Sequence, residues 1–254
     1  MTVALEAAGL AKSFGGVQAV RGVSFQVMEG SITAIIGPNG AGKTTLFNLL
    51  TSLFPADTGR ASLFGGPLTG LPPGEVARRG LVRTFQTARV FPGLTTLENA
   101  LVGAHRRVRS PVVAQALRLR GAGEEERVLA REARELLGAV GLAARADDPA
   151  TDLPAGSQKL LELVRALMAA PRMLLLDEPA AGANEAEVRE LAALLRATRD
   201  VGITLLVVEH NMSLVMDLAD QVICLDLGAV ICDGTPATVQ ADPRVIDAYL
   251  GQAT

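Results

Sequence analysis

A glycine-rich segment places the strongest constraint on the fold of this chain. Residues 37–44 read Gly-Pro-Asn-Gly-Ala-Gly-Lys-Thr, follow the apolar run 32–36, and precede leucines at helical spacing. A strand, a loop of this pattern and a helix form a P-loop, whose backbone N–H groups surround phosphate oxygens. Lys43 would reach the β- and γ-phosphates, and the Thr44 hydroxyl would ligate Mg²⁺. The segment therefore predicts binding of a nucleoside triphosphate. The residues predicted to contact it here are Gly37, Pro38, Asn39, Gly40, Ala41, Gly42, Lys43, Thr44 and Thr45.

Composition and charge exclude several classes of protein. The chain has 254 residues, 49% of them hydrophobic, so it can bury a substantial core. A formal net charge of −3 provides no basic field to attract nucleic acid, and we predict no nucleic-acid partner. The first nine residues carry no basic region, and no uncharged apolar run approaches the roughly 18 residues that a bilayer span needs. The chain is therefore predicted to be neither exported nor membrane-spanning, with Cys224 and Cys232 as reduced, buried side chains.

The order of the predicted elements indicates an α/β fold. Short apolar runs separated by glycines over residues 3–36 predict an antiparallel β subdomain that leads into the P-loop. Beyond residue 157, helical and apolar strand patterns alternate, which is typical of a mainly parallel sheet. The sequence between these parts predicts an inserted α-helical subdomain. The expected division of the single domain 1–254 is a nucleotide-binding core of 1–86 and 157–254 and a helical subdomain of 87–156.

A second motif places two carboxylates at the end of a strand. The apolar run 173–176 is followed by Asp177, Glu178 and Pro179. A carboxylate at the carboxyl end of a strand, beside a P-loop, can hold the water shell of Mg²⁺, which is the role predicted for Asp177. Glu178 lies one residue further, on the other side of the backbone, where it can polarise a water molecule for attack on the γ-phosphorus. Combined with the P-loop, the pair predicts hydrolysis of the bound nucleotide.

These motifs, in this order, resemble those of the ATP-binding subunits of ABC transporters over nearly the whole chain. The resemblance implies a P-loop NTPase with a RecA-like core and with ATP and Mg²⁺ as cofactors. Gln86 matches the glutamine that contacts the metal–water cluster and the membrane subunit, and His210 matches the switch histidine that contacts the γ-phosphate. Phe14 matches the aromatic residue on which adenine stacks. The resemblance thus implies catalytic roles for Lys43, Gln86, Glu178 and His210, and metal contacts for Thr44, Gln86 and Asp177.

The segment that matches the family's signature motif departs from its pattern. That motif reads approximately Leu-Ser-Gly-Gly-Gln and reaches the γ-phosphate bound to the other subunit of a head-to-tail dimer. This chain has Leu-Pro-Ala-Gly-Ser-Gln over residues 153–158, so Pro154 stands where the family has serine. Gly156 still permits close approach, and the helix that starts near Ser157 directs its N-terminus at the phosphate. We expect a weakened contact from Gly156 and Ser157 to the partner's nucleotide.

Four further segments resemble the subunits that drive uptake of branched-chain amino acids. They are 82–86, 91–99, 180–182 and the C-terminal stretch 234–251. The resemblance implies integral-membrane permease subunits and a second ATP-binding subunit, identical or different, as partners. It also implies that a periplasmic or extracellular solute-binding protein is an indirect partner. The chain itself would lie at the cytoplasmic face of the membrane as a peripheral protein.

Other functions remain open from the sequence. The ATP-binding subunits of urea importers and lipopolysaccharide exporters look much alike, and Pro154 keeps open a catalytically weak partner in a heterodimeric ATPase. Soluble ABC ATPases of DNA repair or the ribosome usually carry a long coiled-coil insertion or two cassettes, and this chain has neither.

Overall fold

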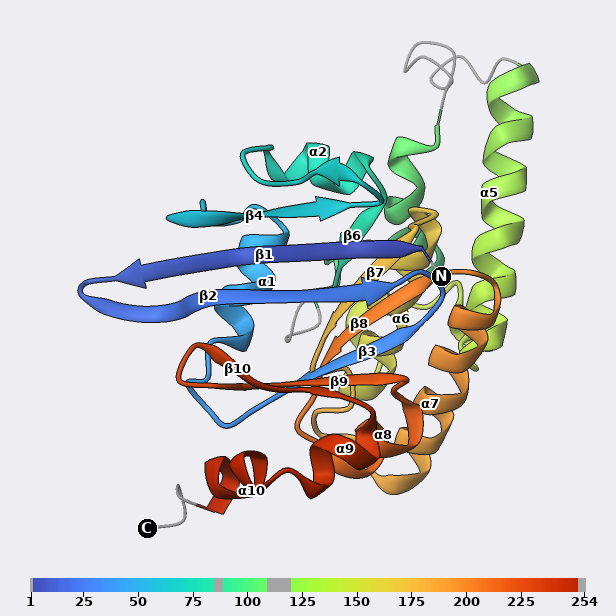
Figure 1. Ribbon diagram of the computed structural model, residues 1–254. Coiled ribbons are helices and arrows are strands. Elements are labelled where there is room, and N and C mark those ends of the chain that lie inside the picture. The colour runs from blue at the N-terminus through green and yellow to red at the C-terminus, as the bar shows by residue number, and fades with distance from the viewer. Residues whose placement is uncertain (1, 85–88, 109–119, 251–254) are drawn as a thin grey trace. The chain divides into compact units, whose positions relative to one another are not determined.

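The computed structural model describes residues 2–84, 89–108 and 120–250, and the chain forms two compact units (Figure 1). The first unit comprises Met1–Arg83 and Arg172–Thr254, and the second comprises Thr84–Pro171. Within the described ranges, no helix is both long enough and apolar enough to cross a bilayer. The P-loop and the acidic pair therefore belong to the same unit, and the signature segment belongs to the other.

A six-stranded sheet with the order β10-β9-β3-β8-β7-β6 forms the centre of the first unit. Its strands are β3 (Ile32–Ile36), β6 (Leu81–Arg83), β7 (Met173–Asp177), β8 (Thr204–Val208), β9 (Gln221–Asp226) and β10 (Ala229–Gly234). All neighbours are parallel except β9 and β10. Strands β3, β7 and β8 are buried at every position, as strands covered on both faces must be. The mainly parallel sheet predicted from the sequence is confirmed, and its carboxyl edge carries both phosphate motifs.

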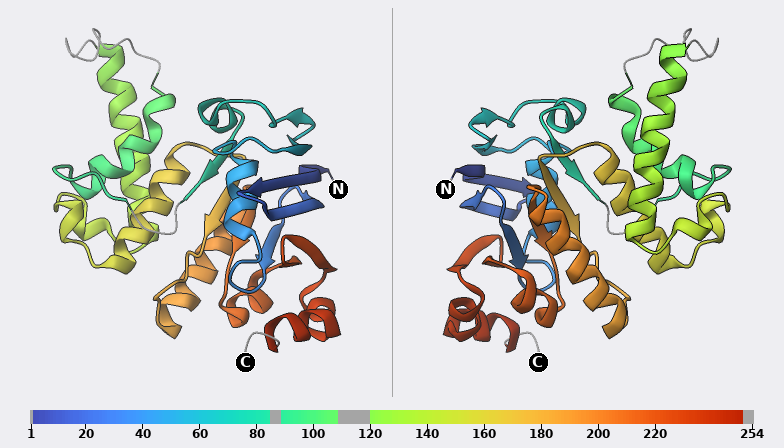
Figure 2. Two further views of the ribbon diagram at one scale, coloured as in Figure 1. Left: turned by 90° about the vertical axis from the view of Figure 1, so that its left-hand side faces the viewer. Right: turned by 90° about the vertical axis from the view of Figure 1, so that its right-hand side faces the viewer.

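A second, antiparallel sheet of the first unit has the order β2-β1-β4-β5. Its strands are β1 (Val3–Phe14), β2 (Val17–Met28), β4 (Thr58–Leu63) and β5 (Gly66–Pro67). Helix α1 (Lys43–Leu50) lies between the two sheets, because Leu46, Phe47 and Leu50 pack in one cluster with side chains of both (Figure 2). The predicted antiparallel subdomain is confirmed, and this packing fixes the helix that begins at the P-loop.

The other face of the six-stranded sheet is covered by helices from the C-terminal part of the chain. Side chains alternate between the two faces of a strand, so Ile35 packs with α1 whereas Ala34 and Ile36 pack with Val215 and Val245. The remaining helices of this unit are α2 (Pro73–Arg78), α7 (Glu185–Asp200), α8 (Met212–Leu218), α9 (Pro236–Ala241) and α10 (Pro243–Leu250). The C-terminal helices therefore lie against the strand that leads into the P-loop.

The second unit is helical. It contains α3 (Thr96–Val102), α5 (Arg120–Ala139), α6 (Ala155–Met168) and the short 3₁₀ segments η1 (Gly103–Arg106), η2 (Ala143–Arg145) and η3 (Ala150–Asp152). A capping box at Thr95 and Glu98 starts α3. Leu161, Val164 and Met168 of α6 pack with Ala100 and Leu137, so α6 groups with this unit. The division expected from the sequence instead puts the residues from 157 onward in the core, to which the following strand β7 does belong.

Candidate functional site

Two glycines of the P-loop are required by close backbone contacts. Gly37 and Gly42 have φ angles of 144° and 98°, conformations that residues with a Cβ rarely adopt. A Cβ on Gly37 would lie 2.1 Å from the carbonyl oxygen of Leu225, and one on Gly42 would lie 2.3 Å from that of Ala19. The loop is therefore packed tightly against neighbouring backbone, and a larger residue at either position would displace it.

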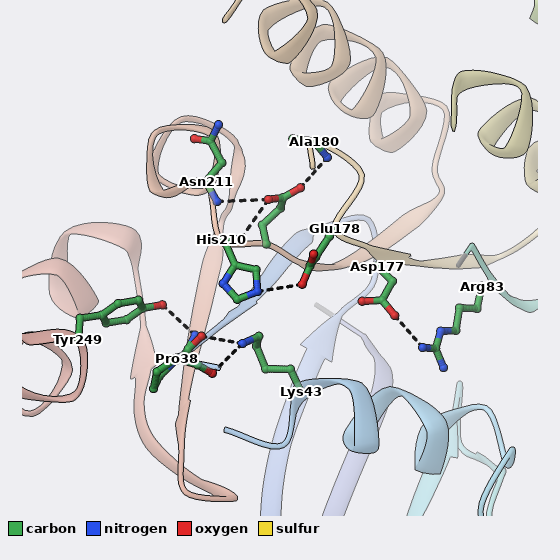
Figure 3. Close-up of polar contacts among 11 residues, drawn as sticks. Pro38, Lys43, Arg83, Asp177, Glu178, Ala180, His210, Asn211 and Tyr249 are labelled. Atoms are coloured by element: carbon green, nitrogen blue, oxygen red, sulfur yellow. Dashed lines mark hydrogen bonds and ion pairs between the residues drawn. The ribbon is translucent and has the colours of Figure 1, made fainter. Parts of the chain in front are cut away.

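The amine of Lys43 lies inside this loop. Its Nζ donates hydrogen bonds to the carbonyl oxygens of Gly37, at 2.6 Å, and Pro38, at 2.9 Å (Figure 3). Burial lowers the pKa of Lys43 below its ordinary value, and the nearby charges of Glu178 and Asp177 oppose that shift. Because α1 begins at Lys43, the N–H groups of its first turn are available to an anion beside the amine. The loop can thus bind phosphate through one cation and several backbone donors.

Asp177 is held by a buried arginine. At the end of β7, its Oδ2 accepts a hydrogen bond from the guanidinium of Arg83 at 2.7 Å, and both side chains are at most 7% exposed. Arg83 also donates to Asn48 Oδ1 at 2.6 Å and lies over the ring of Phe47. Two side chains of α1 therefore help to hold the guanidinium in place. The guanidinium therefore fixes the position of this carboxylate at the sheet edge. The sequence does not predict this contact of Arg83, although an arginine at the end of an otherwise apolar strand is a signal.

We expect Arg83→Met to destabilise the protein strongly, because removing one partner leaves the buried charge of Asp177 uncompensated. Breaking a buried pair in this way costs about 3–5 kcal/mol. Urea unfolding followed by circular dichroism measures the change. The matched control is Arg78→Met, since Arg78 is 61% exposed and paired with Glu75 on the surface, where loss of a pair costs about 1 kcal/mol or less. Equal effects of the two substitutions would contradict this account of Arg83.

Glu178 and His210 are brought together at the ends of two adjacent strands. Glu178 follows β7 in the left-handed backbone conformation, with a φ of 49°, and its N–H donates to the carbonyl oxygen of Val208 in β8. A residue with a Cβ in this conformation is strained, and such strain clusters at functional sites. The His210 Nε2 lies 2.8 Å from Glu178 Oε1 and donates to it (Figure 3). The carboxylate is therefore oriented by an imidazole from the neighbouring strand.

Glu209 is a positioning carboxylate that is not among the site residues predicted from the sequence. Its side chain is 2% exposed and accepts hydrogen bonds from three backbone N–H groups. These belong to Ala180 at 2.7 Å, His210 at 3.0 Å and Asn211 at 3.2 Å. Glu209 thus joins the loop after the acidic pair to the turn that carries His210. A carboxylate directly after the four apolar residues 205–208 was the available signal.

The residue expected to stack on adenine lies at the end of β1. Phe14 is 44% exposed, makes an edge-to-face contact with Phe54 at 5.5 Å between ring centroids, and has the Lys12 amine 5.5 Å from its ring. Lys12 is in turn paired with Asp57. The exposed part of this aromatic ring can stack on a planar group.

The signature segment forms the start of α6 in the second unit. Pro154 is the N-cap residue of this helix and supplies no side-chain hydrogen bond to it, while Gly156 and Ser157 lie in its first turn. The Nε2 of Gln158 donates to the carbonyl oxygen of Leu153 at 2.9 Å and holds the turn before the helix. Gln86, expected to contact the metal, lies outside the described residues.

The donors present fit Mg²⁺ held jointly with phosphate. Among the described residues, no group of three or more His, Cys, Asp or Glu side chains gathers as a metal site. Mg²⁺ commonly uses one or two carboxylates together with phosphate and water oxygens. Asp177 at the strand end and the Thr44 hydroxyl in the first turn of α1 match that donor set.

Comparison with protein families agrees with this arrangement. Residues 20–181 match a family described as ABC transporter, and residues 229–253 match one described as branched-chain amino acid ATP-binding cassette transporter. The chain is 42% identical to the high-affinity branched-chain amino acid transport ATP-binding protein BraF of Pseudomonas aeruginosa, across 98% of both chains. It is 38% identical to the corresponding protein LivG of Escherichia coli K12, across 96% of both.

Solved structures agree as well. The ADP conformation of MJ1267, an ATP-binding cassette of an ABC transporter, superposes with a TM-score of 0.86 at 34% identity, over 99% of this chain and all of that one. A nucleotide-free ATP-binding cassette from an ABC transporter superposes with a TM-score of 0.84 at 33% identity, over 98% of this chain and 99% of that one. The P-loop, the acidic pair and the α/β fold are thus found in a chain that belongs to the ABC transporter family, as one of its ATP-binding subunits.

Proposed function

We propose that this ABC ATPase energises the uptake of branched-chain amino acids by a membrane transporter. The observation that carries its catalytic part is the convergence of Lys43, Glu178 and His210 at the carboxyl edge of one parallel sheet. Similarity along the whole chain to two branched-chain amino acid transport ATP-binding proteins supports the solute class. The match of its C-terminal segment to a branched-chain cassette family supports the same class.

Each residue at the sheet edge has a distinct proposed role. Lys43 leaves the carbonyl oxygens of Gly37 and Pro38 and binds the β- and γ-phosphates of ATP. Thr44 and Asp177 hold Mg²⁺, which neutralises phosphate charge when bound. Glu178 orients and polarises the attacking water. His210 contacts the γ-phosphate, so loss of that phosphate changes the hydrogen bond between His210 and Glu178. Glu209 transmits the same change to the loop after the acidic pair.

The second unit serves a partner subunit in this proposal. Gly156 and Ser157 approach the nucleotide bound to a second ATP-binding subunit, whose own signature segment completes the site of this chain. In the nucleotide site of this chain, Phe14 of the first unit stacks on adenine. Gln86 transmits closure of the dimer to integral-membrane permease subunits, which hold the chain at the cytoplasmic face of the membrane. A solute-binding protein delivers the amino acid to those permease subunits.

ATP hydrolysis by the purified chain, with and without its partner subunits, tests the catalytic proposal. We expect phosphate release that requires Mg²⁺ and that rises when a second ATP-binding subunit is present. A chain that binds ATP but releases no phosphate in either preparation would support the alternative suggested by Pro154, a catalytically weak partner in a heterodimer.

We expect Pro154→Ser to raise the rate of phosphate release about two- to tenfold, the effect of one added hydrogen bond in the transition state. Serine provides a hydroxyl and a backbone N–H where proline has neither, and it is a preferred N-cap for α6. Steady-state phosphate release at saturating Mg²⁺-ATP measures the effect. The control Pro149→Ser changes a proline before η3, outside the signature segment, and should leave the rate unaltered. An unchanged rate in Pro154→Ser would show that the altered signature does not limit turnover.

A further inference from the structure

The only tyrosine of the chain contacts the P-loop from the C-terminal helix. The hydroxyl oxygen of Tyr249, in α10, accepts a hydrogen bond from the N–H of Gly37 at 2.9 Å (Figure 3). The two residues are 212 positions apart in sequence. The proposed chemistry of the site gives Tyr249 no role, and the sequence analysis quoted it only within a segment of resemblance.

Helix α10 is anchored so that the tyrosine ring has a fixed position. Val245 is buried and packs with Ile36, the residue before Gly37, and the ring of Tyr249 packs against the same cluster. At the start of the helix, the Asp242 carboxylate accepts a hydrogen bond from the backbone N–H of Arg244 at 2.9 Å and pairs with its guanidinium at 2.6 Å. The hydroxyl is therefore presented to the P-loop by a helix that packs on the strand leading into that loop.

The hydrogen bond to Tyr249 is donated by Gly37, which also accepts a hydrogen bond from Lys43. Gly37 donates its N–H to Tyr249, and its carbonyl oxygen accepts from Lys43 Nζ at 2.6 Å. The peptide groups on both sides of Gly37 are thus oriented by two side chains. A loop held in one conformation before the ligand arrives binds it more tightly, because less ordering remains to be done on binding.

The surroundings keep this hydroxyl neutral. Burial raises the pKa of Tyr249 to about 12, although the hydrogen bond from Gly37 opposes the shift. A phenolate at this place would put a negative charge beside a loop that must receive phosphate. The phenol therefore acts as a neutral acceptor over the physiological pH range.

We propose that Tyr249 is a positioning residue for nucleotide binding, through which α10 holds the P-loop in its phosphate-binding conformation. The proposal rests on the nucleotide-binding role proposed above for that loop. Helix α10 lies within the segment that matches the branched-chain cassette family, at 229–253, and outside the segment 20–181 that matches the general ABC transporter family. Tyr249 therefore adds a C-terminal support to a loop whose motif is complete without it.

Removal of the hydroxyl alone tests the proposal. We expect Tyr249→Phe in the full chain to weaken ADP binding about two- to tenfold, the range for one hydrogen bond. Phosphate release at saturating ATP should stay within about twofold of the unaltered protein, because the bond is made in the ground state and the transition state alike. Isothermal titration calorimetry with ADP gives the affinity. The control Thr238→Val removes a hydroxyl from the neighbouring helix α9 that bonds with Thr235 and should leave ADP affinity unchanged.

The results separate this proposal from the function on which it rests. If the unaltered chain binds no ADP, the proposed nucleotide site fails. If it binds ADP and Tyr249→Phe binds it equally well, the positioning role alone is overturned. A fall in kcat with unchanged affinity, or a loss of affinity accompanied by an equal loss in Thr238→Val, would overturn it as well.

Discussion

Lys43→Ala will weaken ATP binding by about 100-fold or more, since hydrogen bonds to charged groups contribute about 1.5–3 kcal/mol each. The Lys43 amine is buried within the loop and donates to two of its carbonyl oxygens. Phosphate oxygens would replace these carbonyls as acceptors. Without the amine, the backbone donors of the loop and of α1 remain but the cation is lost. Calorimetric titration with a slowly hydrolysed ATP analogue measures the affinity.

Two comparisons make the Lys43 result specific. Arg78→Ala removes a cation from the surface of the same unit and should leave the affinity unchanged. Thermal unfolding without nucleotide should show that Lys43→Ala remains folded, because Leu46, Phe47 and Leu50 still hold α1 in the core. If Lys43→Ala bound the analogue as tightly as the unaltered protein, the phosphate site would have been placed wrongly.

Glu178→Gln should reduce turnover about 10²- to 10⁴-fold, the usual contribution of a positioned general base. Glutamine keeps the size of the side chain and can still accept the hydrogen bond from His210 Nε2, which lies 2.8 Å from the carboxylate. It cannot accept a proton from the attacking water. ATP binding should persist, so that an ATP-bound dimer accumulates. Single-turnover hydrolysis and size-exclusion chromatography with ATP measure the two effects.

The matched control for Glu178→Gln is Glu185→Gln. Glu185 lies in the first turn of α7 with a side chain 97% exposed. Its replacement by glutamine makes the same change of charge a few residues further along the chain. Its turnover should match that of the unaltered protein. Turnover by Glu178→Gln within about threefold of that value would refute the role in activating water, even if ATP binding were normal.

The sequence predicted the centre of this site because its elements are local. Four apolar residues among the five before the glycine-rich loop indicated a strand buried on both faces, and β3 is buried throughout. The same pattern in β7 placed Asp177 at a strand end. A P-loop motif and an acidic strand end each occupy a few adjacent residues, so their structures follow from local rules.

The residues that support the site were harder to predict because their partners are distant in sequence. Arg83 pairs with Asp177 across 94 positions, Glu209 accepts from Ala180 across 29, and Tyr249 accepts from Gly37 across 212. The order of strands in the sheet brings the first two pairs together, and the packing of α10 on the cluster that contains Ile36 brings the third. A single buried charge in an apolar strand indicates that a partner exists, but it does not identify that partner.

The predicted place of α6 in the core differs from its place in the second unit for a similar reason. Its amphipathic pattern predicted a helix correctly, and the strand that follows belongs to the first unit. The unit to which a helix belongs depends on what its apolar face packs against. Leu161 and Val164 pack with residues of α3 and α5, more than 20 positions earlier in the chain.

Uptake of labelled leucine tests the central claim most directly. The measurement uses the cells that encode this chain, with the gene replaced by its Glu178→Gln or Glu185→Gln form and each protein present at equal abundance. We predict that Glu178→Gln lowers uptake at least tenfold, while Glu185→Gln leaves it unchanged. Leucine uptake that does not depend on Glu178 would contradict the claim that ATP hydrolysis by this chain energises branched-chain amino acid transport.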